Sequence, residues 1–151
     1  LANVRIHDEF NGFVYKSISS IRSIVQHVKF NRQKQVHEPV IFQPDLGRFN
    51  IRVHVVDDKC YAVKVHSKSL DYRYGAELPV VSQVDISPQF AKDCCMLSQQ
   101  MGLVFSGMDF MVKDEQYVFL EANPSPGYAF YEQGLPSNYI SLSLLKYLGL
   151  T

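Results

Sequence analysis

Apolar residues along the chain come in short runs that are broken by charged or turn-forming residues, a pattern typical of β-strands. The runs that predict strands lie at residues 13–16, 39–42, 50–56, 59–65, 104–112 and 116–121. The third and fourth runs flank the pair Asp57-Asp58, and the last two flank Lys113-Asp114-Glu115. Because short turns of this kind join antiparallel strands, the pattern predicts two β-hairpins.

Helical signals lie between and after these strands. Residues 19–28 carry apolar side chains at helical spacing, and residues 140–148 form an apolar-faced segment. Ser87-Pro88 combines an N-cap residue with a proline in the first turn, which predicts a helix that ends near Gly102. Residues 67–84 lack clear periodicity and are expected to form a long loop. Hairpins interspersed with helices predict an α+β fold, an antiparallel sheet with flanking helices.

Composition narrows the classes of protein. The chain of 151 residues has 15 basic and 15 acidic residues, and this balance disfavours a general binder of nucleic acid or of membrane surfaces. A hydrophobic share of 46% excludes a disordered chain. No apolar run reaches the roughly 18–20 residues that cross a bilayer. We therefore expect a single domain over residues 1–151, located in the cytoplasm. Because the chain starts without Met and runs almost directly into a strand, we expect a piece of a longer protein.

Three oxygen-bearing side chains are predicted to gather in the second hairpin. Asp109 lies within the first strand, and Glu121 and Asn123 lie at the end of its partner, two residues apart and so on one face. If the turn pairs the strands as expected, Asp109 comes opposite the neighbourhood of Glu121. Two carboxylates and an amide are hard oxygen ligands that suit Mg²⁺, which takes further ligands from water and substrate phosphates.

The alternative is a solvent-facing strand pair with a carboxylate at each end. Residues 117–120, Tyr-Val-Phe-Leu, form an almost fully apolar run directly before Glu121. We therefore expect the Glu121 carboxylate to lie deep beside the core. A carboxylate in that position is costly unless it is paired or bound to a metal ion, and this favours the metal site.

At this hairpin the sequence resembles the ATP-grasp superfamily, whose signature is an Asp on one strand followed by Glu-x-Asn on the next. Residues 120–127 read Leu-Glu-Ala-Asn-Pro-Ser-Pro-Gly, which is similar to the ribosomal-protein glutamate ligases and to the graspetide-type peptide ligases. The resemblance covers about residues 13–148 and implies the C-terminal part of an ATP-grasp fold. It implies that Asp109, Glu121 and Asn123 hold the Mg²⁺ of ATP, with Mn²⁺ as an alternative ion.

The resemblance also assigns roles to three cations. Arg52 shares a strand face with Asn50 and His54, and an arginine fork suits phosphate or acyl-phosphate oxygens. The family pattern there is Asp-x-Arg, so Asn50 is a departure. Residues 71–73, Asp-Tyr-Arg, resemble the graspetide-type Asp-Trp-Arg, which implies Arg73 as a second catalytic cation. Lys16 ends a strand and matches the lysine that reaches the nucleotide phosphates.

An adenine site is implied in the same way. Residues 41–46 occupy the hinge that holds adenine, which makes Gln43 and Asp45 candidates for nucleotide binding. Gln43 stands where many family members carry Glu. Met111, two residues after Asp109, is a candidate for the apolar floor under the base, and core packing explains it as well. The histidines lack metal-ligand spacing and are given no role.

The function that the resemblance implies is an ATP-dependent ligase. A carboxylate of a peptide or small molecule would attack the γ-phosphorus of ATP to form an acyl phosphate, and an amine or hydroxyl would displace phosphate to give an amide or ester. The family fold has an N-terminal domain and a lid for which residues before Phe13 leave no room, so the isolated chain is expected to turn over slowly or not at all. The alternative is a non-catalytic nucleotide-binding or interaction module. The oligomeric state, a homo-oligomer included, stays open.

Overall fold

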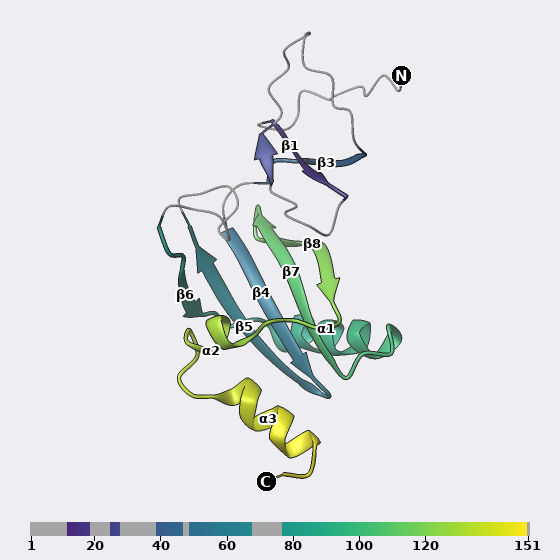
Figure 1. The fold of residues 1–151 in the computed structure, drawn as a ribbon, viewed down its shortest axis with the longest axis vertical. Helices are drawn as coiled ribbons and strands as arrows, with labels where there is room; N and C mark the ends of the chain where they lie inside the picture. The colour runs from purple at the N-terminus through teal and green to yellow at the C-terminus, as the bar shows by residue number, and fades with distance from the viewer. Residues whose placement is uncertain (1–11, 19–24, 28–38, 47–48, 68–76, 151) are drawn as a thin grey trace.

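Two antiparallel sheets form the framework of the chain (Figure 1). This computed structural model describes residues 12–18, 25–27, 39–46, 49–67 and 77–150. The larger sheet has the strand order β6-β5-β4-β7-β8. Its strands are β4 (Phe49–Val56), β5 (Lys59–His66), β6 (Val80–Gln83), β7 (Phe105–Lys113) and β8 (Gln116–Asn123). Both predicted hairpins are confirmed, β4 with β5 and β7 with β8, and the pairing of β4 with β7 joins them.

One face of the larger sheet is apolar and packs against α1 (Pro88–Gln100). The cluster in this core consists of Ile51, Val53, Val55, Ala62, Cys94, Met108 and Phe110. The helix begins as predicted, because Ser87 Oγ accepts the Phe90 N–H at 3.1 Å and Pro88 occupies the first turn. Since alternate residues of a strand point to opposite faces, the polar residues between the apolar ones of β4 face away from α1.

The opposite face of the sheet is covered by the C-terminal part of the chain. A segment leaves β8, crosses the sheet and leads into α2 (Ala129–Glu132) and α3 (Tyr139–Tyr147) (Figure 1). Tyr61 of β5 and Ser143 of α3 are joined by a hydrogen bond of 2.6 Å between their hydroxyls. Glu132 accepts the Ser141 N–H at 2.7 Å and its hydroxyl at 2.6 Å, which ties α2 to the first turn of α3. The predicted C-terminal helix is confirmed.

The smaller sheet has three strands in the order β2-β1-β3. β1 (Phe13–Ser17) pairs antiparallel with both β2 (Gln26–His27) and β3 (Val40–Pro44). This sheet lies beyond the end of the larger one at which the β7–β8 turn is found (Figure 1). Its contact with the larger sheet includes Lys16 of β1, which reaches β8.

Two expectations about local structure are wrong. The helix expected over residues 19–28 is replaced at Gln26–His27 by a strand that pairs with β1, while residues 19–24 and 28 lie outside the described part of the chain. The loop expected over residues 67–84 contains β6, which pairs with β5, and residues 68–76 of it are not described. In both cases pairing with the preceding strand decides the structure, and this pairing is not visible in the local periodicity of the sequence.

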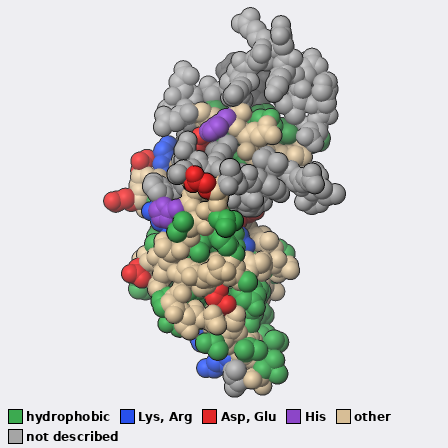
Figure 2. All heavy atoms as spheres, turned by 60° about the vertical axis from the view of Figure 1, so that its left-hand side comes forward, with side chains coloured by type: hydrophobic (Ala, Val, Ile, Leu, Met, Phe, Trp, Pro, Cys, Tyr) green, Lys and Arg blue, Asp and Glu red, His purple; other side chains and the backbone are tan. Residues whose placement is uncertain are grey.

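Among the described residues, no helix is long and apolar enough to cross a membrane. Apolar side chains do come to the surface over α3, at the lower end of the molecule (Figure 2). Those with more than a third of their surface exposed in this part of the chain are Tyr139, Leu142, Leu145, Tyr147, Leu148 and Leu150.

Candidate functional site

A β-bulge in the β7–β8 hairpin brings two carboxylates to one face of the sheet. Strand pairing is regular from the turn to Phe110 and Phe119, but the next pair is Asp109 with Glu121, so Leu120 is an extra residue. Regular pairing would have placed Asp109 opposite Leu120 and turned Glu121 toward the α1 face. The expectation that Asp109 faces Glu121 is therefore confirmed, through a bulge that the sequence does not reveal.

Arg52 lies on the central strand beside this pair. It is opposite Asp109 in the β4–β7 register, and its Nη1 donates to Asp109 Oδ2 at 2.6 Å. Arg52 is only 5% exposed, and its guanidinium carbon lies 5.1 Å from the ring centre of Tyr131. Arg52 Nε is buried and has no hydrogen-bond partner among the described residues. This guanidinium is held at one end by a carboxylate and over an aromatic face, with one buried donor left for a further acceptor.

Gly107 provides the space that the Arg52 side chain occupies. A Cβ built on Gly107 would lie 2.6 Å from the Cβ of Pro126 and would overlap the Arg52 guanidinium. Pro126 is buried, in the segment that crosses from β8 to α2. The absence of a side chain at this position therefore lets Arg52 and the crossing segment share the same part of the sheet.

Glu121 does not lie beside the core, and that expectation is wrong. Its side chain is 49% exposed, and its Oε2 accepts from Lys16 Nζ at 2.8 Å. The apolar residues before it, which suggested burial, belong to an edge strand on which Phe119 is itself 45% exposed. The structure thus gathers Lys16, Arg52, Asp109 and Glu121 in two ion pairs around the bulge.

Asn123 ends β8 and begins the crossing segment. Its Oδ1 accepts the Ser125 N–H at 2.8 Å, and its strand partner is Gly107. Because an amide oxygen has two lone pairs, this hydrogen bond leaves one for another ligand. Asn123 follows Glu121 by two residues in the strand, so both side chains belong to the face of the sheet that carries Asp109.

His54 is a buried polar residue of this face for which the sequence indicated no role. It is 1% exposed, and its Nε2 lies 3.3 Å from the carbonyl oxygen of Gly127, which only accepts, so Nε2 donates. Its Nδ1 is buried and has no partner in the described residues. Burial and then the charge of Arg52 lower the pKa of His54 to about 4, against a smaller opposing effect of the Gly127 carbonyl. The alternation along β4 that singles out Arg52 also places His54 on the same face.

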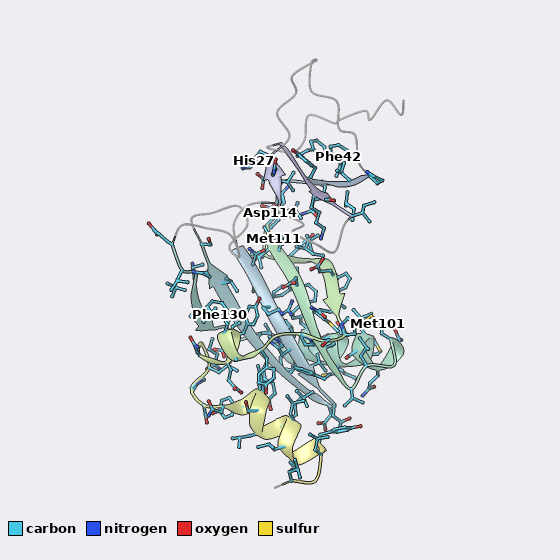
Figure 3. The ribbon with its side chains drawn as sticks, in the orientation of Figure 1. His27, Phe42, Met101, Met111, Asp114 and Phe130 are labelled. Carbon is cyan, nitrogen blue, oxygen red and sulfur yellow. The ribbon has the colours of Figure 1, made fainter. Side chains whose placement is uncertain are left out.

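Of the adenine candidates, Gln43 lies in β3, Asp45 directly follows that strand, and Met111 lies in β7. Gln43 of β3 pairs with Val14 of β1, and Asp45 Oδ2 lies 3.4 Å from the Nδ1 of His27. Met111, labelled on β7 in Figure 3, is 8% exposed. It follows Asp109 by two residues and therefore belongs to the same face of β7. Arg73 lies outside the described residues.

The sequence was compared with models of known protein families, and one of them matches nearly the whole chain. A family model described as RimK-like ATP-grasp domain matches residues 14–147 of the sequence. The chain belongs to this family. The match confirms the resemblance inferred at the hairpin, and the antiparallel sheets with flanking helices confirm the expected α+β fold.

Solved structures show the same ATP-grasp fold in other proteins. The ATP-grasp ligase PsnB, complexed with a phosphomimetic variant of minimal precursor, Mg and ADP, is 22% identical with a TM-score of 0.72, over 91% of this chain and 47% of PsnB. The macrocyclase MdnC from Microcystis aeruginosa MRC, bound with precursor peptide MdnA, is 22% identical with a TM-score of 0.70, over 93% and 48%. D-alanine–D-alanine ligase from Bacillus anthracis is 16% identical with a TM-score of 0.61, over 92% and 51%. The chain spans about half the length of these structures. No curated protein matches it.

The donor chemistry of this ATP-grasp hairpin fits Mg²⁺. In the described part of the chain, no three His, Cys, Asp or Glu side chains are grouped so that they could hold a metal ion. Mg²⁺ does not require such a group, because it is bound through one or two carboxylates, with water and phosphates completing its ligands. Asp109 and Glu121 are strand partners with 20% and 49% of their side chains exposed, and Asn123 follows on the same face.

Proposed function

We propose that this ATP-grasp chain binds ATP with Mg²⁺ and serves as the nucleotide-binding part of a ligase that activates a carboxylate as an acyl phosphate. The observation that carries the proposal is the direct pairing of Asp109 with Glu121, with Arg52 opposite Asp109 on the next strand. Two carboxylates with an adjacent buried guanidinium suit a substrate that is both metal-bound and rich in anionic oxygens.

Each residue of the site has a defined task in this proposal. Asp109, Glu121 and Asn123 hold Mg²⁺, which when bound neutralises negative charge on the phosphate oxygens. Arg52 uses its buried Nε and its Nη groups to orient a phosphoryl or acyl-phosphate oxygen. Lys16 approaches the same region from the smaller sheet and adds a second positive charge. Catalysis by this part of the chain consists of positioning and charge stabilisation, and it needs no nucleophilic side chain.

The proposal also assigns contacts for adenine and a class of substrate. Gln43 of β3, Asp45 directly after that strand, and Met111 of β7 are the proposed contacts for adenine, and Arg73 is proposed as a second catalytic cation. Structures of PsnB with precursor peptide PsnA2 and of MdnC with precursor peptide MdnA support a peptide as the carboxylate substrate, and the proposed acceptor is an amine or hydroxyl. We place the reaction in the cytoplasm, where ATP with Mg²⁺ is available.

The test is calorimetric titration of a non-hydrolysable ATP analogue into the chain, with and without Mg²⁺. The wild-type chain should bind the analogue more tightly with Mg²⁺ than without it. In Asp109→Asn and in Glu121→Gln this strengthening by Mg²⁺ should each be smaller by about tenfold or more. Asp114→Asn is the matched control, because Asp114 lies at the exposed turn of the same hairpin (Figure 3). Equal Mg²⁺-dependent gains in the wild-type chain and in both site variants would contradict the proposed metal site.

A further inference from the structure

The segment that crosses from β8 to α2 covers the face of the sheet on which the candidate site lies (Figure 1). Residues 124–128 make up this crossing segment, which directly follows Asn123. Two of its attachments are already described: Ser125 donates to Asn123, and Pro126 packs at Gly107. The hydrogen bond to Asn123 joins the segment to β8, the strand from which it leaves. The contact at Gly107 is van der Waals packing, which does not fix an orientation as a hydrogen bond does.

A third attachment is a directional hydrogen bond to the central strand. His54 Nε2 donates to the carbonyl oxygen of Gly127 at 3.3 Å. His54 lies opposite Gly107 in the β4–β7 register, and Gly107 lies opposite Asn123 in the β7–β8 register. The three residues therefore form a row across the sheet, and the crossing segment returns over this row.

The imidazole itself is held in place by its surroundings. Its ring centre lies 5.2 Å from that of Tyr131 and 6.2 Å from that of Phe105, with which it is stacked. Tyr131 also lies under Arg52, so this residue of α2 contacts both Arg52 and His54 of β4. A ring packed between two aromatic side chains points its donor in a fixed direction, which a flexible surface donor does not do.

We propose that His54 is a positioning residue of the candidate site: its hydrogen bond to Gly127 fixes the crossing segment and thereby the direction in which Asn123 leaves β8 beside Asp109 and Glu121. The role in binding rests on the proposed function. His54 touches neither metal nor nucleotide in this proposal and acts through residues 124–128.

The test uses three variants of the chain. His54→Leu removes the donor, and His54→Gln retains an N–H donor on a side chain of similar reach. Tyr61→Phe is the matched control, because Tyr61 lies opposite His54 on β5 and the hydrogen bond it loses is made to Ser143 of α3, which is not part of the crossing segment. Amide hydrogen exchange of Asn123, Ser125, Gly127 and Tyr128 is measured without nucleotide, since Pro124 and Pro126 have no N–H. Binding of the ATP analogue is then measured with and without Mg²⁺.

In His54→Leu, exchange of the four amides of the segment, those of Asn123, Ser125, Gly127 and Tyr128, should rise about fivefold, the effect of losing one hydrogen bond. The strengthening of analogue binding by Mg²⁺ should fall by a similar factor, while binding without Mg²⁺ stays within about twofold of the wild type. His54→Gln should restore both values, and Tyr61→Phe should change neither. A purely structural loss would weaken both binding measurements together, and that outcome would overturn the inference.

Two results separate this inference from the proposed function. If the wild-type chain shows no Mg²⁺-dependent binding, the proposed function fails, and unchanged exchange in His54→Leu overturns the hydrogen-bonding role by itself. The wild-type chain also gives an answer without any variant. Nitrogen chemical shifts of its imidazoles should show His54 with the proton on Nε2, and a proton on Nδ1 would contradict the proposal.

Discussion

Arg52 shows at the scale of single residues how this chain keeps a cation away from water. Its guanidinium is paired with Asp109 and lies over Tyr131, and the strand beside it lacks a side chain at Gly107. A buried charge is stable only with a close partner and a space of the right shape. Gly107 thus contributes to the site because it has no side chain. A glycine carries no chemical group that marks it as functional, so the sequence alone did not point to it.

Gly107→Ala is expected to destabilise the fold by about 1–3 kcal/mol, because the added methyl group forces Arg52 and Pro126 apart. Urea unfolding measures this difference. Gly127→Ala is the control, since a Cβ there meets no atom within 4 Å and the backbone φ is not positive. Equal stability of Gly107→Ala and the wild-type chain would show that the guanidinium has room to move.

His54 makes the free energy of unfolding of the chain depend on pH. Its pKa is lowered from 6.5 to about 4 in the folded state, so between these values the unfolded chain binds a proton that the folded chain does not. The free energy of unfolding should therefore fall as pH falls through this range, by about 2 kcal/mol between about pH 7 and pH 5 from this group alone. Urea unfolding at both pH values should show a fall smaller by that amount in His54→Gln, and equal falls in the two proteins would contradict the prediction.

At the scale of elements, the sequence predicts those parts whose signals are local. The turns at Asp57-Asp58 and Asp114-Glu115 define two hairpins, and Ser87-Pro88 defines the start of α1. β2 and β6 are absent from the sequence-based expectations because each forms by pairing with the strand before it and, at 2 and 4 residues, is too short to show strand alternation. α2 is a single turn in a region rich in Pro and Gly, too short for a helical periodicity.

The bulge at Leu120 is the part of the site that the sequence explains least. Counting residues from the turn places Asp109 opposite Leu120, while the general expectation of a nearby Glu121 is right. The exposure of Glu121 was missed for a related reason, because an apolar run on an edge strand does not bury the next residue along the chain. Register and edge position are properties of the sheet, and they are set by pairing between strands.

At the scale of the whole molecule, the two sheets meet at the candidate site. Lys16 reaches from β1 of the smaller sheet to Glu121 of β8, 105 residues further along the chain. Both side chains are partly exposed, 24% and 49%, and exposed ion pairs contribute little to stability. The effect of this ion pair is on the position of its members, because it holds the Lys16 ammonium of one sheet beside the Glu121 carboxylate of the other.

Lys16→Met is therefore expected to change the free energy of unfolding by less than about 0.5 kcal/mol. Binding of the ATP analogue should weaken by about tenfold, since a positive charge near the phosphates is lost. Chemical denaturation and calorimetry on the same preparation separate the two effects. Lys59→Met, which removes a lysine at the far end of β5, should leave both values unchanged. Unweakened binding in Lys16→Met would remove this lysine from the nucleotide site.

The bulge also bears on how sequences of this kind can change by insertion and deletion. Substitutions along β7 and β8 alter single side chains, whereas one residue gained between the turn and Glu121 would move that carboxylate to the side of the sheet occupied by α1. Deletion of Leu120 is an exception, because the ladder then becomes regular and Asp109 stays opposite Glu121. We expect descendants of this sequence that keep the site to vary in composition along the hairpin and to hold its length almost constant.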